Sequence, residues 1–296
     1  MKIKFAIKLA VSVLLVVLIL WKFPVEDIIA NLRNAKLGWV LLSFLLGELI
    51  ILNQAFRWYY LLIVPKEQKP KFAMLLKYTV VGYLFNLFAP GGVGADAYRS
   101  VALGKAHNVM ASSVASVFVA RIFGLVALCL LFWLALPYSE QVPEQAVWFV
   151  AAATLFLFVF CLCILFNPFK TGKFGVFAEK LRSYRNYPLS LLAAFFGSLL
   201  MQILSVLMYF AVFEAVGASI SWTLLFTAIP VAILITAIPI SFNGIGVREW
   251  TLLSLTAYAI DSEQLLASML LGYAVVILQA VQGAIFLHYP HDRIRV

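Results

Sequence analysis

Residues 86–99 read Asn-Leu-Phe-Ala-Pro-Gly-Gly-Val-Gly-Ala-Asp-Ala-Tyr-Arg, a glycine-rich break with two charged residues inside an apolar sequence. A second break follows the same plan, because residues 235–249 read Ile-Thr-Ala-Ile-Pro-Ile-Ser-Phe-Asn-Gly-Ile-Gly-Val-Arg-Glu. The proline and the arginine of the first break both lie 149 residues before those of the second. Two unrelated loops are not expected to share an internal spacing and an offset, so we predict a duplicated unit.

The composition is that of an integral membrane protein. Of the 296 residues, 64% are hydrophobic and 12% are charged, and the mean hydropathy is +1.01. Soluble globular domains carry about 25% charged residues. The positions of the three cysteines and three histidines favour neither a disulfide nor a metal site, and we expect no metal and no other cofactor. A basic face toward anionic lipid explains the net charge of +9, so we expect no nucleic-acid partner.

Long apolar runs predict six transmembrane helices, over residues 5–23, 38–63, 109–136, 146–166, 188–215 and 264–287. Shorter apolar segments flank each break, in the pairs 73–89 with 93–106 and 222–239 with 246–260. The first run is long enough to span a bilayer and lacks a small-residue cleavage site, so we interpret it as a membrane helix and not a signal peptide.

The predicted fold is an all-α polytopic membrane protein with two inverted repeats, each of three transmembrane helices and one broken helical hairpin. Repeat one covers about 1–136 and repeat two about 146–288, within one transmembrane domain over 1–296. Three spans per repeat is an odd number, so the two repeats insert in opposite directions. A 17-residue helix is about 25 Å long against a hydrocarbon core of about 30 Å, which leaves open whether each hairpin re-enters or crosses.

The basic residues predict the orientation. Lysine and arginine concentrate in the N-terminal segment, in 64–77, in 167–187 and in the C-terminal tail, whereas loop 137–145 is acidic and has no lysine. Since cytoplasmic loops carry the basic excess, we predict a cytoplasmic (inner) membrane protein with both termini in the cytoplasm.

The two breaks are the candidate binding site. We expect half-helices to begin after Gly94 and Gly246, where free N–H groups and the helix dipole favour an anion. The backbone seats would be formed by Gly91, Gly92, Gly94, Gly244 and Gly246, and the side chains expected to bind substrate are Asp96, Arg99, Arg121, Asn243, Arg248 and Glu249. The alternative is that the glycines only permit tight hairpins, while the arginines extend to lipid headgroups or pair with neighbouring carboxylates.

Arg121 is the most costly charge, because it lies about 18 Å along its predicted span. A bound substrate or a structural ion pair with Glu48 or Asp96 would satisfy it equally well. Arg57, near the cytoplasmic end of its span, is predicted to snorkel toward the headgroups.

Three further polar residues are expected to support the site: Glu48, Asn86 and Gln202. Gln279 and Gln282 share one face of the last span, and such amides, Gln202 included, also join helices to one another.

These motifs, in this order in a polytopic chain, resemble the flippase-like membrane domain of lysylphosphatidylglycerol synthases. The resemblance covers nearly the whole chain and implies a lipid-translocating domain whose polar positions are Asp96, Arg99, Arg121, Arg248 and Glu249. The chain departs from the family pattern in two ways. Ala120 stands where family members often have an acidic residue, and we expect a member without the synthase domain, since the sequence ends soon after the last span.

The resulting hypothesis is a flippase or scramblase that moves a phospholipid or a lipid-linked phosphate. The expected partners are membrane lipids that are anionic or carry a phosphate, and a separate lipid-modifying enzyme. Two alternatives stay open: an integral membrane transferase acting on a lipid phosphate, and a transporter of a small soluble anion. We expect no enzyme activity, because the sequence contains no motif for a general base or a catalytic metal.

The orientation is testable by cysteine accessibility. In a background with the native cysteines replaced by alanine, we expect an impermeant maleimide to label Ser139→Cys in intact cells, and to label Ser183→Cys only after the inner face is opened. The reverse pattern would contradict the predicted topology.

Overall fold

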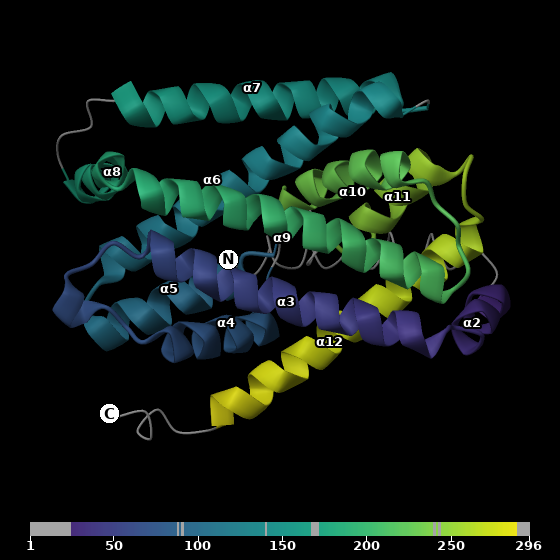
Figure 1. Ribbon diagram of the computed structural model, residues 1–296, viewed down its shortest axis with the longest axis horizontal. Helices are drawn as coiled ribbons and strands as arrows, with labels where there is room; N and C mark the ends of the chain where they lie inside the picture. The colour runs from purple at the N-terminus through teal and green to yellow at the C-terminus, as the bar shows by residue number, and fades with distance from the viewer. Residues whose placement is uncertain are drawn as a thin grey trace.

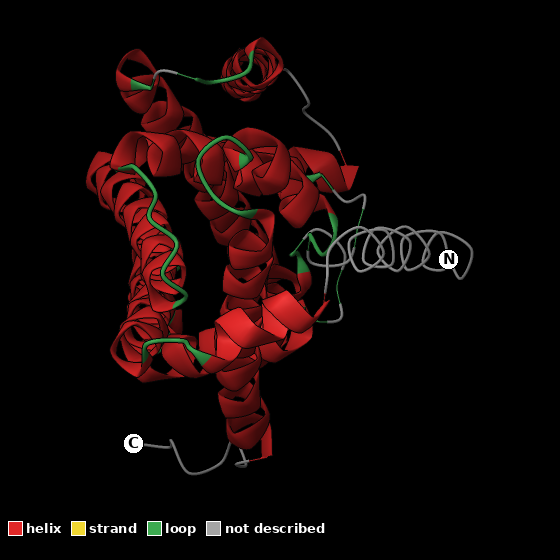
Figure 2. Cartoon of the chain, turned by 90° about the vertical axis from the view of Figure 1, so that its right-hand side faces the viewer, coloured by secondary structure: helices red, strands yellow, loops and turns green. Residues whose placement is uncertain are grey.

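The computed structural model describes residues 25–87, 89, 92–139, 141–166, 172–238, 241 and 244–288. Figure 2 shows helices joined by loops in this part of the chain, with no strand. In chain order the elements are α2 (Val25–Arg33), α3 (Leu37–Leu61), η1 (Lys66–Gln68), α4 (Phe72–Asn86), α5 (Gly94–His107), α6 (Met110–Ala135), η2 (Leu136–Tyr138), α7 (Glu144–Phe166), α8 (Gly172–Ser183), η3 (Tyr184–Asn186), α9 (Pro188–Ala215), α10 (Trp222–Ala237), α11 (Val247–Thr256) and α12 (Ser262–His288). The predicted first span, 5–23, and the candidate residues Gly91 and Asn243 lie outside the described residues.

Five helices in the described ranges are long and apolar enough to cross a membrane. They cover Leu37–Leu61, Met110–Tyr138, Glu144–Cys163, Pro188–Ala215 and Ser262–His288. Each coincides with one of the predicted spans, so the prediction of an all-helical integral membrane protein is confirmed.

The helices occur in two series with the same order of long, short, short and long, first α3 to α6 and then α9 to α12. The first helices of the two series, α3 and α9, pack against each other. In addition, α4 packs against α12 and α10 packs against α6, so the first short helix of each series contacts the last long helix of the other. In Figure 1 the α4/α5 pair lies toward the end of the bundle where α9 begins, and the α10/α11 pair lies toward the opposite end.

Close backbone contact shapes the first hairpin. The Asn86 side chain, at the end of α4, accepts a hydrogen bond from the N–H of Ala95 in α5 at 3.1 Å. Gly94 begins α5 so close to α4 that a Cβ there would lie 2.1 Å from the carbonyl oxygen of Phe85. Gly92 has a φ of +64°, a conformation that residues with a side chain rarely adopt. This turn therefore requires glycine at 92 and 94.

A buried carboxylate shapes the second hairpin. Gly244 and Gly246 have φ angles of +80° and +84°, so this turn also depends on glycine. The carboxylate of Glu249 accepts a hydrogen bond from the Gly246 N–H at 2.6 Å, which satisfies a donor at the start of α11. New helices begin at Gly94 and Val247, as predicted for the segments after the two breaks.

Side chains inside the bundle form a continuous apolar core between α6, α7 and α9 to α12. Its most enclosed members include Phe132, Val150, Phe213, Ile229 and Leu252. The helix α7 is the most peripheral of the five spans in the described ranges, with 17% of its most apolar stretch buried. Its exposed apolar face fits contact with lipid tails, because side chains that face lipid do not expose apolar surface to water.

Gly94→Ala tests the close approach in the first hairpin. We expect it to lower the free energy of unfolding by about 1–3 kcal/mol, because the new methyl group meets backbone and cannot be accommodated by a side-chain rotation. The control is Gly272→Ala in α12, where nothing lies within 4 Å of the added Cβ and no loss of stability is expected. Thermal melting of the purified proteins in detergent measures both, and an unchanged melting temperature for Gly94→Ala would contradict the described hairpin.

Candidate functional site

A cavity of about 270 Å³ lies where the two hairpins meet. Helices α3, α6 and α9 supply its walls, together with the ends of α4 and α10 and the starts of α5 and α11. Its charged lining residues are Arg57, Asp96, Arg121 and Arg248, and its polar ones include Gln54, Asn86, Gln202 and Thr236. The cavity therefore has three guanidinium groups and one carboxylate in its described lining.

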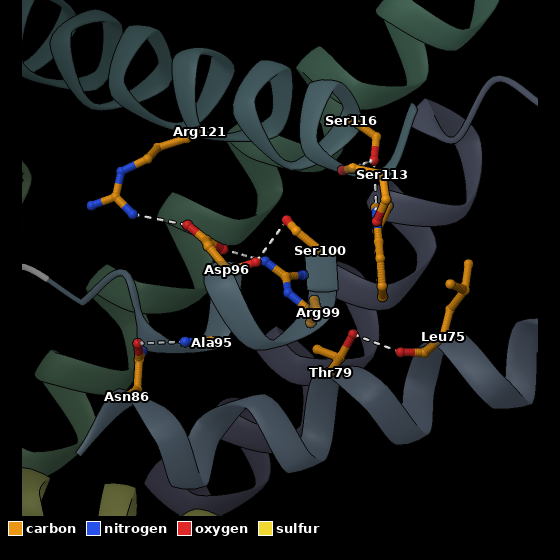
Figure 3. A network of polar contacts seen from close by, with 11 residues as sticks. Leu75, Thr79, Asn86, Ala95, Asp96, Arg99, Ser100, Ser113, Ser116 and Arg121 are labelled. Carbon is orange, nitrogen blue, oxygen red and sulfur yellow. Dashed lines mark hydrogen bonds and ion pairs between the residues drawn. The ribbon is translucent and has the colours of Figure 1, made fainter. Parts of the chain in front are cut away.

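Asp96 is held between two arginines. Its Oδ1 accepts a hydrogen bond from Arg99 Nη2, and its Oδ2 accepts one from Arg121 Nη1 at 2.8 Å (Figure 3). Arg99 is 2% exposed and its guanidinium lies 5.2 Å from the centre of the Trp58 ring. Of the two partners predicted for Arg121, the structure selects Asp96, and the ion pair joins α5 to α6.

Arg57 is a buried cation on α3. Its side chain is 5% exposed, its Nη1 donates to Ser198 Oγ at 2.9 Å, and its Nε has no hydrogen-bond partner among the described residues. No described carboxylate lies within ion-pair distance of it. The prediction that Arg57 snorkels is wrong, because α9 passes over α3 at Gly197, which leaves room for the Arg57 stem, and encloses the guanidinium.

Arg248 and Glu249 are adjacent in sequence but have different surroundings. Arg248 lines the cavity, hydrogen-bonds to Tyr209 and lies 5.8 Å from the ring centre of Tyr273. Glu249 does not line the cavity. It is buried, with one oxygen bonded to the Gly246 N–H and the other accepting from the Tyr273 hydroxyl at 2.5 Å. Its contacts fit a residue that holds the start of α11 in place.

One of the backbone seats expected for an anion, Gly246, and the neighbouring amide of the other hairpin, at Ala95, already have hydrogen-bond acceptors within the protein. The Ala95 N–H donates to Asn86, and the Gly246 N–H donates to Glu249. Gly92 does line the cavity. Side chains, and not these two amides, are therefore the groups available to a ligand.

The predicted supporting residues separate into two groups. Asn86 and Gln202 line the cavity, and Gln202 also joins α9 to α6 by donating to the Gly124 carbonyl at 3.2 Å. Glu48 does not line the cavity and faces Gln279 and Gln282 of α12 instead.

The sequence interpretation missed Arg57, Gln54 and Thr236 as lining residues. A signal existed for the first two, because Gln54 and Arg57 are three residues apart and so share a helix face inside an apolar span. Thr236 gave no signal, since a threonine in an apolar helix commonly bonds to its own backbone, as Thr236 does to Ile233 at 2.9 Å.

Comparison with protein families matches residues 5–281 to the family described as the lysylphosphatidylglycerol synthase TM region. No curated protein matches the chain at a significant level. The match covers nearly the whole chain, with both hairpins and all the residues around the cavity. The chain belongs to the family of lysylphosphatidylglycerol synthase transmembrane regions.

Proposed function

We propose that the protein is a flippase or scramblase that moves lipids with a phosphate-bearing headgroup across the cytoplasmic membrane. The observation that carries this proposal is Arg57, a guanidinium on a membrane-spanning helix that is 5% exposed, lines the cavity and has no described carboxylate within ion-pair distance. An unpaired charge in a membrane interior costs several kcal/mol by order of magnitude, and such residues mark substrate pathways. A bound anion would supply the missing partner.

The arginines fit a phosphate group in particular. A guanidinium presents a planar fork of N–H donors that matches two phosphate oxygens, and Arg57, Arg121 and Arg248 reach the cavity from three different helices. The cavity volume of about 270 Å³ lies near the lower limit of ligand pockets, which is about 300 Å³. It suits a headgroup and excludes two acyl chains, which would remain in the surrounding lipid.

Asp96 supplies a way to release the headgroup again. In the structure its carboxylate holds Arg121, whose side chain is 31% exposed and so accessible to a ligand. A phosphate that enters would compete with Asp96 for Arg121, and on exit the carboxylate would take the arginine back. Because Asp96 and a phosphate would compete for Arg121, this ion pair would weaken binding of the headgroup and favour its release.

An inverted-repeat architecture would give this cavity access from both sides of the membrane. The repeated helix order and the position of the hairpins at opposite ends of the bundle support it. The helices α4 and α10, of 15 and 16 residues, are about 22 and 24 Å long, which favours re-entrant hairpins. The orientation with cytoplasmic termini, in the inner membrane, rests on the distribution of basic residues.

A transporter of a soluble anion would use the same cavity, and the transport assay separates it from a flippase by the substrate that moves. A transferase would need a general base, and the one described carboxylate in the lining has both oxygens already occupied by hydrogen bonds from arginines. The geometry therefore favours transport over transfer.

Lysine substitution tests whether the guanidinium fork binds phosphate. In vesicles that contain the purified protein and a fluorescent phosphatidylglycerol, we expect Arg57→Lys, Arg121→Lys and Arg248→Lys to slow dithionite-detected translocation by about tenfold or more, because lysine keeps the charge but loses the bidentate contact. The matched control, Arg185→Lys on an exposed residue of η3, should transport at the wild-type rate. Wild-type rates in folded variants of all three cavity arginines would refute the site.

Substitution of Arg57 should abolish transport without lowering the stability of the protein. We expect Arg57→Met to leave the melting temperature unchanged or higher, since it removes a buried charge that has no carboxylate partner, and to abolish translocation. By contrast, Asp96→Asn should destabilise the protein by about 3–5 kcal/mol, because Arg99 then loses its carboxylate. Glu179→Gln, at an exposed carboxylate of α8, is the control for loss of a negative charge. A large loss of stability in Arg57→Met would show a structural role and oppose the proposal.

A further inference from the structure

We propose that Glu48 is a proton-binding site between α3 and α12, and that proton movement through this site drives the transport. The proposal goes beyond the flippase activity and rests on it, because it supplies an energy source for the movement of lipid. It starts from a carboxyl group near the middle of a membrane-spanning helix that does not line the arginine-rich cavity.

Glu48 has no cation beside it in the described part of the chain. No described lysine or arginine lies within ion-pair distance of its carboxyl group. Its Oε1 is buried and accepts no hydrogen bond from a described residue. A carboxylate that leaves water without a cation or enough donors is costly, and binding a proton removes that cost. The position therefore suits a carboxyl group that takes up a proton when enclosed and releases it when water reaches it.

The side of α12 that faces Glu48 carries amides. Gln279 and Gln282 both face the carboxyl group. Gln279 is 2% exposed, and its Nε2 donates no hydrogen bond to a described residue. An amide has a donor and an acceptor, so it can donate to an ionised carboxylate or accept from a protonated one. A lysine or arginine would favour only the ionised form. The two glutamines can thus hold Glu48 in either protonation state.

Glycines bring α12 against both neighbouring helices. A Cβ at Gly47, the residue before Glu48, would lie 2.3 Å from Gln279 Nε2, so glycine leaves the space that this amide occupies. About one turn further along α12, Gly283 packs closely against the backbone of α4. The helix α12 therefore contacts the proton site on α3 and also α4, which leads into the first hairpin.

Tyr83 connects the proton site to the arginines. It lies on α4 within electrostatic range of Glu48 and also of Arg57, Arg99 and Asp96. The helices α6, α9 and α12 also pack against α3, but they place no described charged group beside Glu48. A change of charge at Glu48 thus occurs next to the helix that forms the first hairpin and close to the groups around the cavity.

The proton transfer needs only water as its partner. On the acidic side a hydronium ion gives up a proton and becomes water, while a Glu48 oxygen forms an O–H bond. On the other side this bond breaks and the proton returns to water. An arrangement of the helices that encloses Glu48 favours the protonated form, and one that exposes it to water favours the ionised form, so proton uptake and release shift the population between the two.

A pH gradient across reconstituted vesicles tests the coupling. The probe is fluorescent phosphatidylglycerol, the membrane potential is clamped with potassium and valinomycin, and dithionite measures the final share of probe in each leaflet. If one proton accompanies each lipid, we expect the wild-type protein to change the ratio between leaflets by up to about tenfold per pH unit, since each unit is a tenfold ratio of proton activity. The final ratio does not depend on the direction in which the protein is inserted.

Glu48→Gln keeps the size of the side chain but cannot bind and release a proton. We expect this variant to give the same ratio between leaflets with and without the gradient. The control is Glu179→Gln, at an exposed carboxylate of α8, which should behave as the wild type. Two results would overturn the coupling while leaving the flippase proposal intact: a wild-type protein that moves lipid but ignores the gradient, or a Glu48→Gln variant that still follows it.

A second measurement needs neither a variant nor lipid movement. Dicyclohexylcarbodiimide is an apolar reagent that reacts with protonated carboxyl groups away from water, and mass spectrometry of peptides locates the product. We expect it to label Glu48 in the wild-type protein, more at acidic than at alkaline pH, and to leave Asp96 unlabelled, because both oxygens of Asp96 are bonded to arginines. An unlabelled Glu48 at every pH would overturn the proton site. A labelled Glu48 in a protein that moves no lipid would retain the site and refute the flippase proposal on which the coupling rests.

Discussion

The shared hydrogen bonds of Asp96 with Arg99 and Arg121 are the interaction on which the centre of this protein depends. They join α5 to α6 and give two cations inside the helix bundle a shared counter-ion. Without the carboxylate, Arg99, which is 2% exposed, would be a buried charge with no counter-ion. The cavity beside this ion pair nevertheless keeps an excess of arginine, because Arg57 and Arg248 also line it. On one wall the Asp96 carboxylate pairs with two arginines, whereas Arg57 has no described carboxylate within ion-pair distance and could be paired by an anionic ligand.

Glycine makes this arrangement sterically possible. The first hairpin brings the start of α5 into contact with the end of α4 at Gly94, and α12 also approaches α4 closely at Gly283, where a Cβ would lie 2.6 Å from the Val80 carbonyl oxygen. These approaches place the short helices α4 and α5, and with them Asp96, inside the bundle. Irregular backbone is tolerated at this depth because polar side chains satisfy it, Asn86 in the first hairpin and Glu249 in the second.

Much of the fold can be predicted from the sequence, because the features that indicate membrane spans and hairpins are local or periodic. Hydropathy located the five spans that the structure describes, and the glycines marked the two hairpins. Arg57 was misjudged because its burial depends on α9, a helix more than 130 residues further along the chain. The role of Glu249 depends on the fold in the same way, since its partner Tyr273 comes from α12. Pairings between distant helices are set by tertiary packing, and one sequence contains no direct signal for them.

The most direct test of the central claim is a density map of the protein in a phosphatidylglycerol nanodisc. The account predicts a phosphate-sized feature within hydrogen-bond distance of Arg57, together with a movement of Arg121 away from Asp96 and acyl chains that leave the cavity toward the lipid. Lipid confined to the outer surface, with Arg57 enclosed only by protein and Asp96 still bound to both arginines, would contradict it.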